Sequence, residues 1–126
     1  SLFFCTYYID LQRDTYRTVT QLHRVGDVLG DEVSFTAGLQ IYAHHFVHPD
    51  DREAYLSVMN TEHLKNTLRW WQPSVAVEYR RLPEGPRPGE YSWVRATAML
   101  SHAGGDDVPQ TAVYVAQDIT EGRRPH

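Results

Sequence analysis

The segment that most constrains the fold is the helix start within residues 46–56. Pro49 suits the first turn of a helix because its missing N–H would be unpaired there in any case. Asp50, Asp51 and Glu53 follow it and place negative charge at the positive end of the helix dipole. Behind them apolar residues recur at three- and four-residue spacing, which gives this helix one face to bury. Strand-like runs lie on both sides of it, so we expect a sheet whose strands are split around the helix.

The strand-like runs are marked by β-favouring residues that alternate with a period of two. Residues 2–11 and 15–20 precede the helix and are expected to pair as an antiparallel hairpin. The runs after the helix are residues 75–80, 91–102 and 109–119, and the last two are joined by a hairpin turn at 103–107. Residues 83–90 cannot continue a strand because three prolines remove backbone donors. Small residues on one face of the last two strands leave room for a pocket beneath the helices.

Helical spacing fills the middle of the chain. Ser34 is a candidate N-cap for a helix that runs to Phe46. Thr61 is a second candidate cap, for a helix that Pro73 ends. The buried face of this second helix is expected to consist of Leu64, Leu68 and Trp71. Glycines interrupt residues 21–30, so we expect an irregular segment with helical turns there. The order of elements predicts an α+β domain with an antiparallel sheet covered on one face.

Length and composition limit the class of protein. A chain of 126 residues is expected to form one domain, residues 1–126, around one core. Its net charge of −4, with both signs mixed, argues against a nucleic-acid surface, which needs clustered Lys and Arg. No stretch approaches the roughly 18 consecutive apolar residues of a membrane span. The single cysteine, Cys5, excludes an internal disulfide and is interpreted as a small buried hydrophobe.

Three features then coincide along the chain. They are His48-Pro49-Asp50-Asp51-Arg52 at the helix start, Glu78-Tyr79-Arg80 followed by Gly89-Glu90-Tyr91-Ser92-Trp93-Val94-Arg95, and the closing Asp118-Ile119-Thr120-Glu121. In this order they resemble the PAS sensor-domain family, in its PAS fold-3-like subgroup, and the resemblance covers nearly the whole chain. It implies a five-stranded antiparallel sheet in which the first strand sits centrally, with helices from the middle of the chain enclosing a cleft.

The resemblance also implies a function. Such domains sense or regulate in bacterial signalling proteins, bind a small ligand or a partner domain, and signal through a C-terminal linker to an effector. We expect a diguanylate cyclase or a histidine kinase of a two-component system as effector, outside this chain, which would then be a non-enzymatic domain excised from a larger protein. A homodimer and a cytoplasmic location are expected, although PAS-like folds also occur outside the membrane. The ligand-pocket candidates are Leu39, Tyr42, Phe46, Tyr55, Val94, Ala96 and Tyr114, and the signal-relay candidates are Asp118, Ile119 and Thr120.

Other functions stay open beside this one. A structural PAS-like module would dimerise and hold a neighbouring domain in place, with a cleft filled by its own side chains. A small α+β enzyme would need His45 to converge with a carboxylate, and the sequence does not show such a pair. Flavin-binding light sensors of the family carry an Asn-Cys-Arg-Phe segment on a helix. Nothing similar occurs here, which excludes photochemistry by that route, and the cofactor, if any, is not identified by the sequence.

Two clusters of polar residues invite a chemical interpretation. His44 and His48 are four residues apart, so with His45 they suggest a helical face for a metal or a haem. Because a residue before proline is biased away from helical backbone, His48 breaks that face, and we expect no metal site. A haem-binding sensor stays a further alternative, since one axial histidine is enough. Asp50 and Asp51 would point about a hundred degrees apart on a helix, which suits capping better than paired catalysis.

Overall fold

The fold is given by a computed structural model that describes residues 3–82 and 90–123, so residues 83–89 of the proline-rich loop lie outside the described part. Its strands are β1 (Phe3–Asp10), β2 (Thr15–Thr20), β3 (Ser74–Arg81), β4 (Ser92–Ala103) and β5 (Pro109–Asp118). Its α-helices are α1 (His23–Leu29), α2 (Phe35–Phe46), α3 (Arg52–Met59), α4 (Thr61–Thr67) and α5 (Thr120–Arg123). Two short 3-10 turns, η1 (Pro49–Asp51) and η2 (Gly105–Asp107), precede α3 and join β4 to β5.

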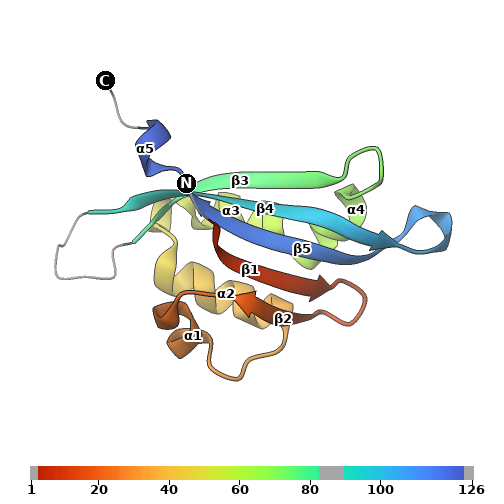
Figure 1. Cartoon of the computed structure of the whole chain (residues 1–126), viewed down its shortest axis with the longest axis horizontal. Helices are drawn as coiled ribbons and strands as arrows, with labels where there is room; N and C mark the ends of the chain where they lie inside the picture. The colour runs from red at the N-terminus through yellow and green to blue at the C-terminus, as the bar shows by residue number, and fades with distance from the viewer. Residues whose placement is uncertain (1–2, 83–89, 124–126) are drawn as a thin grey trace.

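The five strands form one antiparallel sheet in the order β2-β1-β5-β4-β3. Helices α1 to α4 gather on one side of it, and α5 stands at the end where β3 and β5 finish (Figure 1). This arrangement confirms the expected α+β class and the sheet split around a central group of helices. The middle strand is β5, and β1 is an inner strand beside it, because β1 pairs with both β2 and β5.

Alternation along the strands decides which side chains face the helices. Val94, Ala96 and Ala98 of β4 are fully buried, as predicted from the period of two. On β5 the buried inner positions include Ala112 and Ala116. These small residues lie in the same core as the larger side chains of the helices, among them Phe35, Leu39, Tyr42, Phe46, Tyr55, Met59 and Leu64. The core therefore lies between one face of the sheet and the helices.

The helix boundaries follow local chemistry. The Ser34 hydroxyl accepts a hydrogen bond from the Ala37 N–H at 3.2 Å, which confirms the predicted cap of α2. Helix α4 is capped one residue earlier than predicted, because Asn60 Oδ1 accepts from the His63 N–H at 2.8 Å. The prediction that Trp71 shares a buried helical face is wrong: α4 ends at Thr67 and the chain turns, leaving Trp71 59% exposed. Residues 21–30 contain the short helix α1.

Asp14 fixes the hairpin turn between β1 and β2 to the helical layer. It has a positive φ of 54°, which Asp tolerates better than most residues. Its carboxylate accepts hydrogen bonds from the Ser34 hydroxyl, from the N–H and hydroxyl of Thr36, and from the Thr61 hydroxyl. Burial acts to raise the pKa of Asp14, but these hydrogen bonds outweigh it and lower the pKa. One carboxylate thus ties the starts of α2 and α4 to the first hairpin.

Candidate functional site

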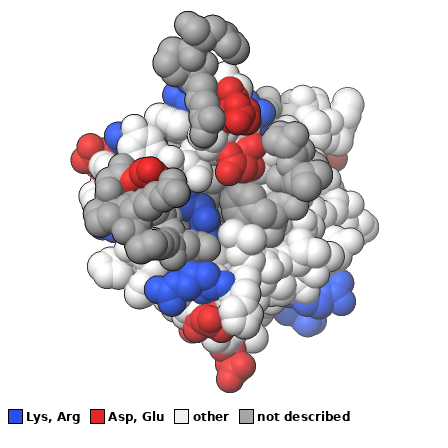
Figure 2. Space-filling view, turned by 60° about the vertical axis from the view of Figure 1, so that its left-hand side comes forward, with Lys and Arg blue, Asp and Glu red and all other residues white. Residues whose placement is uncertain are grey.

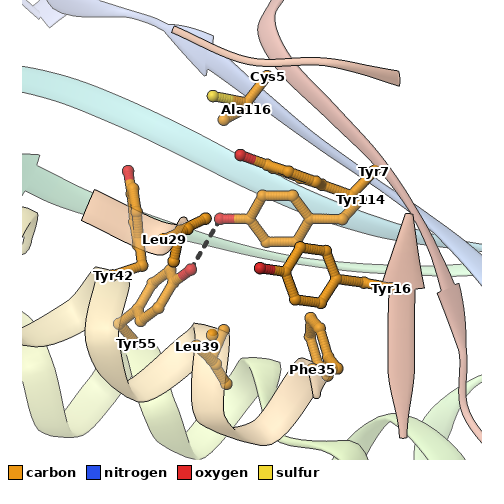
Figure 3. A pocket seen from close by; sticks show the side chains of 11 residues that line it. Cys5, Tyr7, Tyr16, Leu29, Phe35, Leu39, Tyr42, Tyr55, Tyr114 and Ala116 are labelled. Carbon is orange, nitrogen blue, oxygen red and sulfur yellow. Dashed lines mark hydrogen bonds between the residues drawn. The ribbon is translucent and has the colours of Figure 1, made fainter. Parts of the chain in front are cut away.

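A small cavity lies between the helices and the inner face of the sheet, with a volume of about 40 Å³. Its wall consists of side chains from β1, β2, β5 and the first three helices (Figure 3). The residues that line it are Cys5, Tyr7, Tyr16, Leu29, Phe35, Gly38, Leu39, Tyr42, Tyr55, Tyr114 and Ala116. A ligand pocket in proteins typically measures roughly 300 to 1,000 Å³. In this conformation, therefore, aromatic side chains fill most of the cleft.

Four of the seven predicted pocket residues line the cavity, namely Leu39, Tyr42, Tyr55 and Tyr114. The other three, Phe46, Val94 and Ala96, are buried in the same core but lie outside the wall. For Val94 and Ala96 the reason is their lateral position in the sheet. The cavity lies over β1 and β5, whereas Val94 and Ala96 belong to β4, which is the next strand along the sheet.

Several residues of the wall were missed from the sequence. Tyr7 shares the inner face of β1 with the buried Cys5 and Ile9, so the period of two along that strand was the available signal. Tyr16 on β2 is half-buried, and its ring lies against Gly38 of α2. No pattern in the sequence predicts the contact between Tyr16 and Gly38, because it depends on how the first hairpin packs against α2.

The tyrosine hydroxyls of this core are mostly paired with one another. Those of Tyr55 and Tyr114 are 2.8 Å apart, and those of Tyr42 and Tyr79 also share a hydrogen bond. Tyr7 donates to Gln21 Oε1 at 2.9 Å. Burial raises the pKa of Tyr42 to about 12, and it raises the pKa values of Tyr55 and Tyr114 well above their ordinary range. All these phenols are therefore neutral at physiological pH, and the cavity has an uncharged wall.

The predicted relay residues connect β5 to the first residues of β4. Asp118 Oδ1 accepts a hydrogen bond from the Thr120 N–H at 2.8 Å, at the start of α5. The Thr120 hydroxyl accepts from the Trp93 N–H at 2.9 Å, and the Ile119 N–H donates to the Trp93 carbonyl at 2.8 Å. All three candidates thus lie together, and α5 begins from a fixed position beside the sheet.

A line of charged and aromatic contacts runs from the start of α3 to α5. The Asp51 carboxylate accepts from the backbone N–H of Arg80 at 2.8 Å and from its Nε at 2.9 Å, and the hydrogen bonds from Arg80 lower the pKa of Asp51. The Arg80 guanidinium lies 5.7 Å from the centre of the Trp93 ring, and that of Arg123 lies 3.7 Å from it. Arg123 in turn forms a 2.6 Å ion pair with Glu78 of β3. Helix α3 and helix α5 are therefore joined through side chains of β3 and β4.

The histidines of the sequence lie away from the cavity. His44 and His45 are exposed at the end of α2, and Nδ1 of His48 accepts from the Asp50 N–H at 3.1 Å. Within residues 3–82 and 90–123, no group of three or more His, Cys, Asp or Glu side chains is placed to hold a metal ion. Among the described residues that line the cavity there is no histidine, and the cavity volume is far below that of a porphyrin. The residues present do not fit a haem in this cleft.

Charged side chains of both signs lie on the face of the molecule shown in Figure 2. On the face shown in Figure 2, acidic and basic side chains lie scattered among uncharged residues, without a continuous basic patch. This distribution agrees with the net charge of −4. In the part of the chain that the structure describes, none of the helices has the length and apolar character needed to span a membrane.

Comparison with known proteins places the fold. No family model and no curated protein matches the sequence. Solved structures do match, among them an RNA-binding light-oxygen-voltage receptor with a TM-score of 0.65 and 18% identity, over 97% of this chain and 31% of that one. This chain therefore spans about a third of that receptor's length.

Two further matches come from signalling proteins. The N-terminal domain of a diguanylate cyclase with a PAS/PAC sensor from Marinobacter aquaeolei has a TM-score of 0.62 and 16% identity, covering 95% of this chain and 98% of that one. A sensory box histidine kinase/response regulator from Burkholderia thailandensis has a TM-score of 0.50 and 17% identity, covering 95% and 79%. At these identities the likeness concerns architecture. The strand order, the layer of helices on one face and these matches together show that the chain has the PAS domain fold.

Proposed function

We propose that this chain is a sensory domain that binds a small molecule in the cavity and passes the change through α5 to an effector that follows it. The effector would be a diguanylate cyclase or a histidine kinase, the kinds of protein whose sensor domains share this fold. The chain itself then acts by a shift in population: a ligand favours whichever arrangement of the exit segment it binds better.

The observation that carries this proposal is the position of strand β5. Tyr114 and Ala116 of β5 line the cavity, and Asp118 stands two residues further along the same strand. A change at the cavity wall that shifts this strand therefore reaches the start of α5 over a few residues. Because Thr120 is bonded to the backbone of Trp93, such a shift must also alter the contact between α5 and the sheet.

The line of contacts through Asp51 supports a second route to the same exit. Tyr55 lines the cavity and lies one helical turn after Asp51 on α3. Movement of this helix changes the position of Asp51, which holds Arg80 beside Trp93. The cavity is thus connected to α5 by two routes, one along strand β5 and one through the contacts of Asp51, Arg80 and Trp93.

One observation favours a second function. A cavity of about 40 Å³ is small for a ligand site, which suits a structural module with a cleft filled by its own side chains. Such a module would dimerise and hold its neighbouring domain in place. It predicts no ligand, and its effect on the effector would depend on dimer contacts alone.

The native mass of the purified domain, compared with its denatured mass, tests the proposal. An excess in the native state supports the sensory function, and its size gives the mass of the ligand. The test variant is Ala116→Val, which adds two carbons at the cavity wall. Because these carbons fill the cavity, the variant is expected to lose the excess native mass. Equal native and denatured masses for the wild type, in a monomer or a dimer, would favour the structural module or a weakly held ligand, and titration with small probes then separates these two.

A further inference from the structure

The wall of the cavity limits the charge of a ligand. Among the described residues that line it there is no Asp, Glu, Lys, Arg or His. A carboxylate or an ammonium group would lose its hydration there without an opposite charge to replace it, which costs far more than burial of a neutral group. The acidic residues Asp31 and Glu32 lie outside, in a depression that shares Tyr16 and Leu29 with the cavity. Their negative charge disfavours an anion in this depression as well.

Two hydroxyl protons of the wall have no acceptor among the described residues. The Tyr16 hydroxyl points into the cavity (Figure 3) and has no hydrogen-bond partner in the described structure. Tyr55 and Tyr114 hold two hydroxyl protons between them, and the bond that joins their oxygens uses one. The other has no acceptor among the described residues. An unpaired donor in the buried Tyr55–Tyr114 pair is unfavourable, and the half-buried Tyr16 hydroxyl offers a second donor, so an occupant that supplies an acceptor gains a hydrogen bond.

The size of the cavity sets the scale of the occupant. At about 40 Å³ the cavity admits a molecule of only a few non-hydrogen atoms. Tyr16 and Leu29 line both the cavity and the outer depression, where Thr18 and Gln21 also lie.

From these three observations we infer that the cavity selects a small neutral molecule with an apolar body and one hydrogen-bond acceptor, such as a short ketone. The Tyr16 hydroxyl donates to that acceptor, and the aromatic wall covers the apolar body. This inference rests on the sensory function proposed above. It adds the chemical class of the ligand and names Tyr16 as the residue that donates a hydrogen bond to it.

Three probes of similar size separate the classes: 2-butanone, which is neutral, butyrate, which is an anion, and sec-butylamine, which is a cation at neutral pH. Each is titrated into the domain labelled with ¹³C-tyrosine, and the ring signals are followed by NMR. We expect 2-butanone to shift the signals of Tyr16 and Tyr114 at concentrations up to about 10 mM, as its size allows. Butyrate and sec-butylamine are expected to bind at least about tenfold more weakly.

Two matched variants locate the donor. Tyr16→Phe keeps the ring against Gly38 but removes the hydroxyl, and it is expected to weaken 2-butanone binding about tenfold. Tyr8→Phe removes a hydroxyl from an exposed tyrosine of β1 and is expected to leave binding unchanged.

Three results would overturn the inference: equal binding of a charged probe, unchanged binding by Tyr16→Phe, or no binding of 2-butanone. These failures are distinct from failure of the proposed function. A charged molecule retained in the native mass would refute the ligand class and leave the sensory function standing. Equal native and denatured masses, together with no binding of any probe, would refute both the ligand class and the sensory function.

Discussion

Loss of the Tyr114 hydroxyl gives a direct measure of the pairing inside the core. Tyr55 and Tyr114 are 1% and 5% exposed, and their hydroxyls are 2.8 Å apart. Tyr114→Phe keeps the ring, so it adds no cavity cost of the kind seen in large-to-small substitutions. It leaves the Tyr55 hydroxyl buried without its partner, which costs about 1 to 3 kcal/mol. We expect the free energy of unfolding to fall by about 2 kcal/mol, and Tyr55→Phe to have a similar effect.

The double variant decides between pairing and independent effects. With both hydroxyls replaced by hydrogen, this pair leaves no buried donor or acceptor without a partner. Tyr55→Phe/Tyr114→Phe is therefore expected to be close to the wild type in stability. The coupling free energy in the double-mutant cycle is then about 4 kcal/mol, the sum of the two single losses. Tyr8→Phe on the exposed face of β1 is the control, with an expected change within about 0.5 kcal/mol.

Urea unfolding followed by tryptophan fluorescence measures all four variants under the same conditions. The slope against urea is expected to stay constant, so that the shift of the midpoint reports stability alone. Additive losses in the double variant would refute the reasoning, because they would mean that each hydroxyl has a separate partner, such as a water or a ligand. Single variants that cost less than about 0.5 kcal/mol would refute it as well.

Three further predictions concern the carboxylates. Asp14→Asn is expected to lower the free energy of unfolding by about 1 to 2 kcal/mol at pH 7, and an unchanged urea midpoint would contradict its anchoring role. Hydrogen bonds from Arg80 lower the pKa of Asp51, so this carboxylate stabilises the fold above its unfolded pKa of about 3.9 and loses that contribution as pH falls through the lower folded value. Asp51→Asn should therefore lose less stability between pH 7 and about pH 2 than the wild type does, as urea titrations can show. Asp118→Ala removes the acceptor for the Thr120 N–H and is expected to change the free energy of unfolding by about 1 kcal/mol or less. It is also expected to speed hydrogen exchange at α5 and to weaken signalling by the longer protein. Unchanged signalling would exclude Asp118 from the relay.

The parts of the fold that the sequence predicted are those set by local periodicity. Strand β4 illustrates this, because every second residue from Val94 to Ala98 is buried, as its alternation requires. The Ser34 cap is equally local, since a side chain three residues from its partner needs no tertiary contact. The relay residues 118–120 were placed by their resemblance to a motif, and the hydrogen bonds of Ile119 and Thr120 to Trp93 became visible only in the structure.

Errors arose where a local pattern competes with tertiary structure. Trp71 continues the apolar spacing of Leu64 and Leu68, yet the paired backbone bonds between Arg69 and Gln72 make a turn there and expose the ring. Asp14 lies in the turn between β1 and β2. Its bonds to residues 20 and 47 positions away depend on where the helices pack, and no spacing in the sequence encodes them.

Gly38 shows why the cavity wall was harder to predict than the core. A glycine inside helix α2 costs up to about 1 kcal/mol relative to alanine, so its presence indicates a close approach by another group. The structure supplies that group: a Cβ at Gly38 would lie 2.9 Å from Cε1 of Tyr16. Without this approach the Tyr16 ring could not lie flush with the helix, and its hydroxyl could not reach the space beside Tyr55 and Tyr114. The donor that we assign to the ligand therefore depends on the absence of one methyl group on the facing helix, a dependence that Gly38→Ala would expose as weaker 2-butanone binding.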